Sequence, residues 1–313
     1  MNEFELIKKN TTEIVTEDEY NKLINEVEKP IAYAGYEPSG KIHLGHVLTV
    51  NKLIDLQKQG FEIIILLADL HAYLNKKGTL KEVKEIADYN KKCFIALGLS
   101  KDTRFIYGTD FQLNKEYSLK VLEFSLSTSL NRAKRSMDEV GRNMDKPMVS
   151  QMLYPIMQTV DIDMLKCNVA VGGIDQRKIH MLARELLPNP PICIHLPILL
   201  GLNGKKMSSS ENNYISIDDS EEVVNKKLKK AFCPAGVVVD NPVLDLFKYF
   251  IFEKYDEVLF EIPEKYGGDL ACKSYEELES LFLSNSIHAM DLKLSAAKYL
   301  NYMLEPIRDA IDY

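Results

Sequence analysis

The sequence has no long hydrophobic run and no leader of the secretory kind. No apolar stretch approaches the roughly 20 residues that a membrane-spanning helix needs, and the chain is 313 residues long with ordinary hydrophobic content, 46%. The segment Met1–Glu5 has neither the basic start nor the apolar core of a signal peptide. From these absences we expect a cytoplasmic chain that makes no membrane contact.

Cysteine is scarce and scattered. The chain has five cysteines, an odd number, and none of them are paired at the close spacing of a metal-binding motif. They are Cys93, Cys167, Cys193, Cys233 and Cys272. Widely separated cysteines in a chain of this kind do not form a disulfide framework. We therefore expect neither disulfides nor a protein-held metal.

An excess of positive charge is also missing. The chain carries 39 Lys and Arg against 46 Asp and Glu, a net charge of −7 at pH 7. This balance excludes nucleic-acid binding through one uniformly basic surface, but it leaves a local basic patch open. The sequence shows no internal repeat and no low-complexity tract, and its length suits a full core and two domains.

What the chain does contain is an alternation of apolar, β-branched runs with segments of helical periodicity. This pattern predicts a doubly wound parallel sheet of the α/β class, with strands buried on both faces. The expected strands are 31–36, 61–68, 104–107, 168–171 and 192–199, and the expected helices are 1–28, 46–59, 79–98, 148–166 and 174–187.

Two segments depart from this alternation. Residues 113–147 are polar and helical, which predicts a helical insertion between the halves of the sheet. From residue 220 onward the periodicity is helical, over 220–231, 242–252, 274–284 and 291–313. We therefore expect an α/β domain over residues 1–215 and an all-α C-terminal domain over residues 216–313.

The stretch from Tyr33 to His46 joins the first strand to the first helix. After the strand comes a Pro-Ser-Gly turn, and then His43-Leu44-Gly45-His46 opens the helix. Backbone N–H groups at a helix N-terminus that follows a strand favour an anion. The two histidines add donors there, so this stretch predicts a site for a nucleotide phosphate.

A second motif, Lys206-Met207-Ser208-Ser209-Ser210, lies in a loop near the end of the α/β domain. A lysine followed by hydroxyl groups in a mobile loop can hold a triphosphate and follow its charge as a bond breaks. A solvated surface loop is an equally good interpretation of this motif alone. The presence of the two histidines in the same α/β domain favours the triphosphate.

In this order, the two motifs resemble the HIGH and KMSKS motifs of class I aminoacyl-tRNA synthetases. Leu44 stands in place of Ile, and Ser209 in place of the second Lys, which shifts more of the phosphate binding to Lys206 and the hydroxyls. The resemblance covers essentially the whole chain and is closest to the short archaeal and eukaryotic tyrosyl-tRNA synthetases. It implies a Rossmann catalytic domain, an inserted dimerisation segment, a helical anticodon-binding domain, and ATP with Mg²⁺ on its triphosphate.

The segment 148–166 carries polar groups on one helical face. Tyr154, Gln158 and Asp161 are spaced i, i+4 and i+7, and a carboxylate among apolar neighbours needs a partner. Gln158 alone is explained as well by a surface-facing helix. The resemblance implies that Tyr33 and Asp161 hold the phenol hydroxyl of L-tyrosine, and that Tyr154, Gln158 and Gln176 hold its ammonium end.

The resemblance also assigns the remaining site residues. Substrate binding includes Glu37, and ATP binding includes Gly35 and Gly45 with His43, His46, Lys206 and Ser209. The catalytic set is His43, His46, Lys206, Ser208, Ser209 and Ser210. Contacts with tRNA(Tyr) are expected from Arg132, Arg135, Arg177, Cys233, Tyr266, His288 and Asp291.

Several alternatives stay open at this point. A ligase for tryptophan or for a tyrosine analogue would share the nucleotide motifs, although it would not need the pair Tyr33 and Asp161. A non-catalytic relative that only binds tRNA would not need the triphosphate loop. A small nucleotidyltransferase would not explain the Lys206 loop or the helical C-terminal part. His71 remains open as a pocket residue, and we expect His180 and His195 to be packing or surface residues.

Overall fold

The computed structural model describes residues 3–141, 145–205, 207 and 212–312. The chain forms two compact units, the first comprising Met1–Gly40 and Thr49–Pro197, the second Lys41–Leu48 and Ile198–Tyr313. The short segment with the two motif histidines therefore belongs to the second unit, although the sequence on both sides of it belongs to the first. The predicted boundary near residue 215 lies within the second unit.

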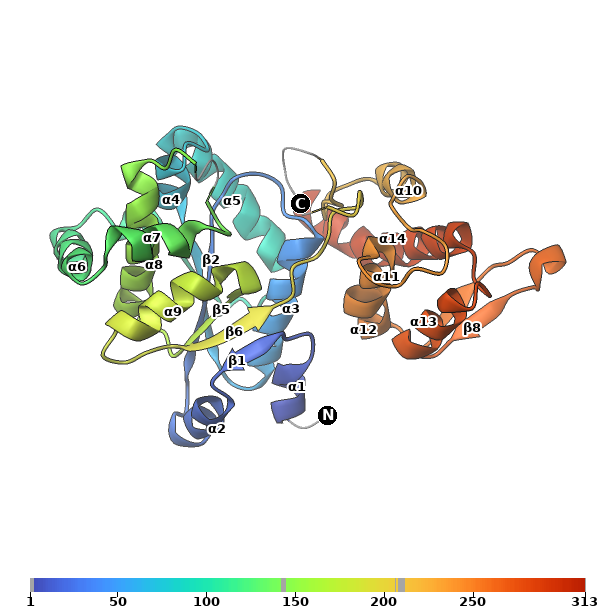
Figure 1. Ribbon diagram of the computed structural model, residues 1–313, viewed down its shortest axis with the longest axis horizontal. Coiled ribbons are helices and arrows are strands. Elements are labelled where there is room, and N and C mark those ends of the chain that lie inside the picture. Colours follow the sequence, from blue (N-terminus) through green and yellow to red (C-terminus); the bar gives the residue numbers. More distant parts are fainter. Residues whose placement is uncertain (1–2, 142–144, 206, 208–211, 313) are drawn as a thin grey trace. The chain divides into compact units, whose positions relative to one another are not determined.

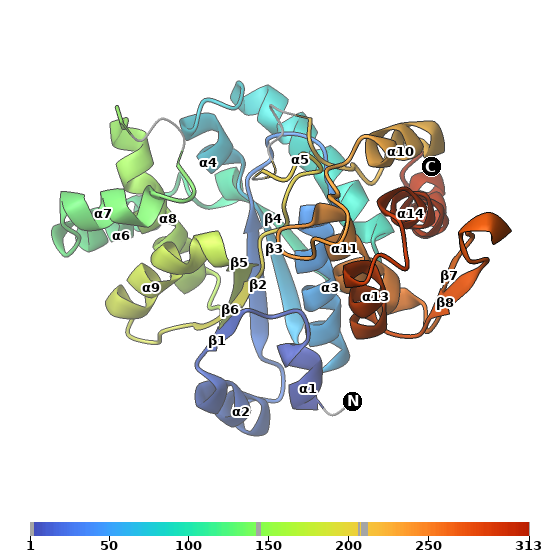
Figure 2. The same ribbon diagram turned by 45° about the vertical axis from the view of Figure 1, so that its right-hand side comes forward.

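The first unit is built on a six-stranded sheet with the order β1-β6-β5-β2-β3-β4 (Figures 1 and 2). The strands are β1 (Glu13–Val15), β2 (Ile31–Tyr36), β3 (Glu62–Leu67), β4 (Arg104–Tyr107), β5 (Val169–Gly173) and β6 (Ile192–Leu196). All pairs are parallel except that of β1 with β6. The predicted doubly wound α/β class is confirmed. Strand order reverses between β2 and β5, and in such sheets ligands bind at the carboxyl ends of the strands at this point.

Helices cover both faces of this sheet (Figures 1 and 2). Helices α3 (Leu44–Lys58) and α5 (Leu80–Ala96) lie on one face, and α8 (Val149–Met164) and α9 (Arg177–Leu186) on the other. Covering both faces explains why β3 reads Glu-Ile-Ile-Ile-Leu-Leu, with every residue after Glu62 buried. The predicted strands and the helices between them are all present, with ends shifted by a few residues.

The remaining helices of the first unit are short. They are α1 (Glu3–Lys8), α2 (Glu17–Glu26), α4 (Asp69–Leu74), α6 (Lys115–Leu126) and α7 (Leu130–Met137). Helices α6 and α7 occupy the segment predicted as a helical insertion. The prediction that residues 1–28 are helical was wrong for residues 13–15, which pair with β6 instead. Thr16 then starts α2 with a capping box to Glu19.

The second unit is mainly helical, as predicted. Its helices are α10 (Glu221–Lys229), α11 (Pro242–Leu246), α12 (Phe252–Lys254), α13 (Tyr275–Leu283) and α14 (Ala289–Asp312), with a π-helical segment at Phe247–Ile251. It also contains an antiparallel hairpin that the sequence did not predict, β7 (Val258–Phe260) with β8 (Leu270–Cys272). Strands of three residues are too short to show an alternating pattern. Across the described ranges, no helix has the length and hydropathy to cross a membrane.

Candidate active site

The two motif histidines lie where the chain enters α3, and they are held against the segment that follows the Lys206 loop. Leu44 N donates to Ile215 O at 3.1 Å, and Ile217 N donates to Ile42 O at 3.0 Å. The rings of His43 and His46 are 4.0 Å apart between centroids. Backbone pairing thus holds the histidines beside one end of the loop that the sequence assigned to the triphosphate.

Hydrogen bonds from the backbone fix the tautomer of both imidazoles. Nδ1 of His43 accepts from Gly45 N, and Nδ1 of His46 accepts from His43 N, each at 3.2 Å. A ring nitrogen that accepts carries no hydrogen, so both rings are protonated at Nε2. Burial lowers the pKa of His43 to about 2 and that of His46 to about 4. Both rings are therefore neutral near pH 7, and each offers one N–H donor.

The close packing of this segment leaves no room for a side chain at Gly45. A Cβ there would lie 3.0 Å from Cε1 and 3.1 Å from Nδ1 of His43, and 3.6 Å from the sulfur of Met207. The ring of Tyr214 lies 5.0 Å from that of His43. Met207, within the motif, and Tyr214, four residues after it, therefore both lie close to His43. The other loop residues assigned to catalysis, Lys206, Ser208, Ser209 and Ser210, lie outside the described residues.

Asp161, in the first unit, is a fully buried carboxylate with one satisfied and one unsatisfied oxygen. Its Oδ1 accepts from Tyr117 OH and from Gln112 Nε2, each at 2.8 Å. Its Oδ2 has no hydrogen-bond partner among the described residues. Burial raises the pKa of Asp161 to about 7, although the two donors on Oδ1 lower it. This oxygen is an acceptor that the described residues leave without a donor.

Tyr33 supplies a second polar group beside this carboxylate. The side chain is buried on β2, and burial together with the charge of Asp161 raises the pKa of its hydroxyl well above the usual range. A Cβ at Gly35 would overlap the Tyr33 hydroxyl. Gly35 therefore leaves the space that this hydroxyl occupies. The predicted pair Tyr33 and Asp161 therefore lies close together.

The other predicted substrate residues also belong to the first unit. Gln158 Nε2 donates to Gln176 Oε1 at 3.3 Å. Tyr154 lies one turn before Gln158 on α8, and burial raises the pKa of its hydroxyl, with the charges of Glu37 and Asp161 adding to the effect. Glu37 is held in turn, because it accepts from Asn75 Nδ2 at 2.6 Å and lies 3.5 Å from Lys77 Nζ. The carboxylate of Asp161 thus lies near Tyr33. The amide groups of Gln158 and Gln176 and the carboxylate of Glu37 are the polar groups on the side of Tyr154.

Sequence reasoning missed two residues of this pocket. Gln112 and Tyr117 bind Asp161. Gln112 lies just before the segment interpreted as an insertion and Tyr117 near its start, where no strand or motif marks them. His71, which the sequence left open, lies beside Tyr154 and Asp161. Its ring packs edge-on against Tyr154 at 4.5 Å, and its Nε2 is 3.7 Å from Asp161 Oδ2.

His180 and His195 are buried, so the surface interpretation was wrong and the packing interpretation holds. His180 Nδ1 lies 3.0 Å from His195 Nε2, and His195 Nδ1 lies 2.8 Å from Glu13 Oε1. Arg177 donates to the same oxygen of Glu13 at 2.5 Å. This chain of contacts ties α9 and β6 to the short strand β1.

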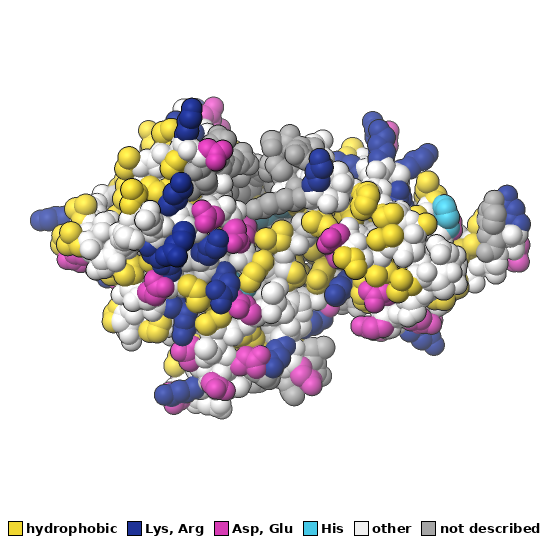
Figure 3. All heavy atoms as spheres, viewed as in Figure 1, with side chains coloured by type: hydrophobic (Ala, Val, Ile, Leu, Met, Phe, Trp, Pro, Cys, Tyr) yellow, Lys and Arg dark blue, Asp and Glu magenta, His cyan; other side chains and the backbone are white. Residues whose placement is uncertain are grey.

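The arginines assigned to tRNA differ in their availability. Arg132 makes a bidentate pair with Glu185 at 3.0 and 3.1 Å, and Arg177 is bound to Glu13. Arg135 is exposed and has no ion pair among the described residues. Figure 3 shows Lys and Arg side chains gathered over α7 and α9. Asp and Glu side chains lie among them (Figure 3), and Arg132, Arg177 and Lys178 are paired with carboxylates.

The residues assigned to the anticodon lie in the second unit. Cys233 is buried, with its sulfur 3.5 Å from Asn241 Nδ2, so it does not present its thiol at the surface. His288 is exposed and accepts from Met290 N at 3.2 Å at the start of α14, and Asp291 is in the first turn of that helix. Tyr266 ends the turn Glu264–Tyr266, and its side chain lies outside what the structure describes.

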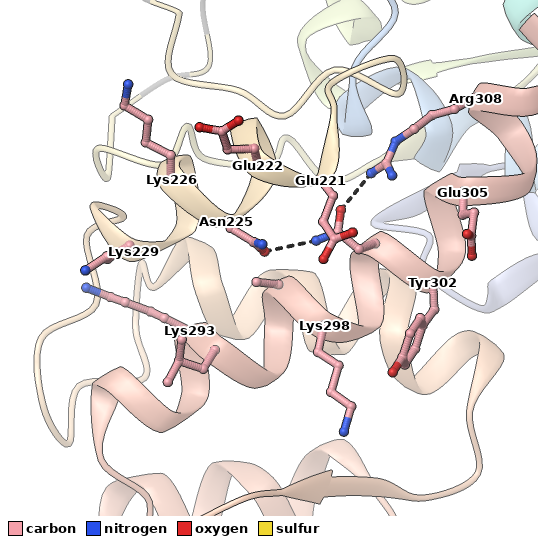
Figure 4. A pocket seen from close by; sticks show the side chains of 13 residues that line it. Glu221, Glu222, Asn225, Lys226, Lys229, Lys293, Lys298, Tyr302, Glu305 and Arg308 are labelled. Carbon is pink, nitrogen blue, oxygen red and sulfur yellow. Dashed lines mark hydrogen bonds between the residues drawn. The ribbon is translucent and has the colours of Figure 1, made fainter. Parts of the chain in front are cut away.

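A groove of about 740 Å³ lies between α10 and α14 of the second unit (Figure 4). Lys226 and Lys229 of α10 and Lys293 of α14 lie towards one end of it. None of these three lysines forms an ion pair within the described ranges, whereas Lys298 on the same helix pairs with Glu261. Lys293 follows Asp291 by two residues. The groove therefore presents unpaired positive charge next to a predicted anticodon residue.

A protein-held metal has no ligand set in the part of the chain that the structure describes. No group of three or more His, Cys, Asp or Glu side chains there could hold one ion. All five cysteines are buried, and none of them forms a disulfide.

Comparisons with known proteins identify the family of the chain. Residues 25–305 match the family of tRNA synthetases class I (W and Y). A tyrosine–tRNA ligase of Methanococcoides burtonii is 65% identical, with the full length of both chains covered. The crystal structure of a tyrosyl-tRNA synthetase complexed with L-tyrosine from Archaeoglobus fulgidus has a TM-score of 0.94 at 56% identity, covering 99% of this chain and 98% of that one.

A more distant structure preserves the same fold. The tyrosyl-tRNA synthetase complexed with L-tyrosine from Pyrococcus horikoshii has a TM-score of 0.91 at 32% identity, covering 100% of this chain and 97% of that one. The family match spans β2, both motifs and most of α14, but not β1. The chain therefore belongs to the class I tRNA synthetases of the tryptophan and tyrosine group.

Proposed function

We propose that this chain is a tyrosine–tRNA ligase, which activates L-tyrosine with ATP and transfers the tyrosyl group to the 3′ end of tRNA(Tyr). The observation that carries the choice of amino acid is the buried Asp161, whose Oδ2 has no partner within the described residues and lies near Tyr33. A site that hydrogen-bonds a hydroxyl rejects an analogue without it by about 10⁴ to 10⁵, a factor measured for tyrosine against phenylalanine in this enzyme class.

In the first step, a carboxylate oxygen of tyrosine attacks the α-phosphorus of ATP. The new O–P bond gives tyrosyl-adenylate, and the bond to the bridging oxygen breaks to release pyrophosphate. No side chain acts as nucleophile, so catalysis rests on positioning and on stabilising charge at the phosphates. ATP enters as its Mg²⁺ complex, because Mg²⁺ binds preferentially through substrate phosphates.

The motif histidines suit this step. Both are neutral, and Nδ1 of each accepts from a backbone N–H. The Nε2–H of His43 is the donor that we assign to a phosphate oxygen. A preorganised donor of this kind is worth about 10² to 10³ in rate. We assign Lys206 and Ser208 to Ser210 to the triphosphate, and Gly35 and Gly45 to the close approach of the backbone to the nucleotide.

In the second step, a hydroxyl of the terminal ribose of tRNA attacks the carbonyl carbon of the adenylate and AMP leaves. Arg135 supports binding of the acceptor end, since it is exposed and has no ion pair among the described residues. We assign residues 216–313 to the anticodon. His288, Asp291 and Tyr266 are proposed contacts, and the unpaired lysines of the groove between α10 and α14 add attraction for the RNA backbone.

We also propose that the active form is a homodimer in the cytoplasm. Leu119, Leu122 and Leu126 lie on one face of α6 at i, i+3 and i+7, and they are 54%, 64% and 90% exposed. Figure 3 shows hydrophobic side chains at the surface around α6. A row of exposed leucines on a helix marks a protein interface. Buried cysteines that form no disulfide support a reducing compartment.

ATP–pyrophosphate exchange with tyrosine, phenylalanine and tryptophan tests the proposal. Exchange that depends on tyrosine, with phenylalanine and tryptophan at background, is the expected result. An absence of tyrosine-dependent exchange would overturn it, and preference for tryptophan would identify the other branch of the family. Binding of tRNA without formation of any adenylate would indicate a non-catalytic relative.

A further inference from the structure

Two buried polar atoms without hydrogen-bond partners among the described residues lie beside each other in the first unit. They are Oδ2 of Asp161 and Nε2 of His71. Leaving a buried polar group unpaired is unfavourable, and native interiors rarely do so. Such a pair is explained when a ligand supplies the missing partners.

The hydrogen positions around this place follow from the fixed acceptors. A carboxylate only accepts, so Gln112 must direct its amide nitrogen, not its oxygen, at Asp161 Oδ1. The same nitrogen lies 3.3 Å from Nδ1 of His71. Because that nitrogen has a hydrogen to donate, Nδ1 accepts it. The ring hydrogen of His71 is therefore on Nε2, the atom that has no partner.

Nε2 of His71 and Oδ2 of Asp161 are thus an unpaired donor and an unpaired acceptor. They are 3.7 Å apart, which is beyond a good direct hydrogen bond. One hydroxyl oxygen can lie within reach of both, donating its hydrogen to Asp161 and accepting from His71. A hydroxyl both donates and accepts, which is what this pair of groups requires.

We infer that His71 is a further specificity-determining residue, which donates from Nε2–H to the phenol oxygen of the substrate. This inference rests on the proposed function, and it adds a donor to the pair Tyr33 and Asp161. Phenylalanine would leave both the imidazole N–H and the carboxylate oxygen unpaired. His71 therefore contributes to the rejection of phenylalanine as well as to the binding of tyrosine.

Two other contacts suit His71 to this role. Its ring is held edge-on against Tyr154 at 4.5 Å, which fixes the direction of Nε2. Burial lowers the pKa of His71 to about 4, so the ring stays neutral at the pH of activity. A neutral imidazole can donate to the phenol oxygen without favouring ionisation of the phenol, as a charged imidazolium would.

The test compares the wild type and one His71 variant, each with tyrosine and with phenylalanine as substrate. His71→Phe keeps an aromatic ring and removes the donor, and kcat/KM is measured by pyrophosphate exchange with tyrosine and with phenylalanine. We expect a loss of about 10- to 100-fold with tyrosine, the value of one hydrogen bond between buried groups, and no loss with phenylalanine. An equal loss with both amino acids would show that His71 only packs, and would overturn the inference.

A matched control removes another buried imidazole of the first unit. His195→Phe lies outside the pocket, so its ratio of tyrosine to phenylalanine activity should equal that of the wild type. His71→Gln returns an N–H donor and should recover part of the lost discrimination. A ratio that falls as much in His195→Phe as in His71→Phe would count against a local role.

A measurement on the unaltered protein covers the case in which the variants do not fold. With ¹⁵N-labelled histidine, the Nε2–H signal of His71 should shift when tyrosine binds and remain in place with phenylalanine. A signal that tyrosine leaves unmoved would overturn the inference. Failure of the proposed function is seen separately, as an absence of tyrosine-dependent exchange in the wild type.

Discussion

Tyr117 and Gln112 donate to the same carboxylate oxygen of Asp161, each at 2.8 Å. Hydrogen bonds to an ionised carboxylate lower its pKa, so the pKa of Asp161 would be higher without these two donors. The other oxygen of Asp161 is left for the substrate. The ionisation of Asp161 should therefore set the pH dependence of tyrosine activation.

Tyr117→Phe tests this dependence. Loss of the donor raises the pKa of Asp161 above its present value of about 7, so a larger fraction is protonated at neutral pH and unable to accept. We expect kcat/KM for tyrosine to fall several-fold near about pH 7, to recover above about pH 8, and its acid limb to move to higher pH. Tyr107→Phe, which removes a tyrosine–aspartate bond with Asp88 elsewhere, is the control. An unmoved pH profile in Tyr117→Phe would contradict this account.

Asp161→Asn separates stability from activity. The pKa of Asp161 is about 7 in the folded state and about 3.9 in an unfolded chain, so the unfolded state binds fewer protons between these values. The free energy of unfolding of the wild type should therefore fall as the pH rises from about 4 to about 7, and this group should cause no further change above that range. The amide does not titrate.

We therefore expect Asp161→Asn to unfold at a higher temperature than the wild type at about pH 8, by at least about 2 °C, and the difference to shrink towards about pH 5. Tyrosine-dependent exchange should be largely lost at every pH. The measurement is thermal unfolding of the ligand-free protein at both pH values. A variant that is less stable than the wild type at about pH 8 would refute the burial argument.

Gly45→Ala should damage the nucleotide step and spare amino-acid binding. The new methyl group would press on the ring of His43 and disturb the bond from Gly45 N to Nδ1 that fixes its tautomer. We expect kcat of pyrophosphate exchange to fall about 10- to 100-fold, with the dissociation constant of tyrosine unchanged in the absence of ATP. Equilibrium binding and exchange kinetics check the two parts. If Gly45→Ala had the kcat of the wild type, the orientation of His43 would have no role in the nucleotide step.

The exposed face of α6 should govern assembly. Replacing Leu122 and Leu126 by Glu places two charges in the proposed interface, and desolvating unpaired charges is costly. We expect a monomer by sedimentation or light scattering, with the helical content of the wild type. Val239→Glu, at a site 72% exposed in the second unit, is a control that should leave the mass unchanged. A dimer that persists in the double variant would place the interface elsewhere.

The lysines of the groove should affect the binding of tRNA and leave the activation of tyrosine unchanged. In the triple variant of Lys226, Lys229 and Lys293 to Gln, we expect KM for tRNA to rise. The salt slope of binding should fall by up to about 3, since each phosphate contact adds about one. Tyrosine-dependent exchange should stay at the wild-type value. A triple Gln variant at Lys81, Lys84 and Lys92 of α5 matches the charge change as a control. Equal effects of the two triple variants would indicate only a general loss of positive charge.

Sequence and structure agree where a long pattern or a motif was available. The buried run 61–68 predicted β3, and the spacing of Tyr154, Gln158 and Asp161 placed three polar groups along one helix. β1 escaped prediction because its three residues are strand only through pairing with β6, a tertiary contact. Gln112 and Tyr117 escaped because neither has a periodic or motif signal, and their role depends on where Asp161 lies. The buried state of His180 and His195 likewise depends on Glu13, far away in the sequence.

The pairing of β1 with β6 has a consequence for the behaviour of the chain in concentrated solution. β6 is entirely buried and apolar apart from His195, and its outer side would otherwise present free N–H and C=O groups. Such an edge is a template for joining another chain. β1 pairs with this edge over its three residues, and Glu13 adds a charge there that binds His195 and Arg177. The N-terminal strand therefore protects the sheet against intermolecular association.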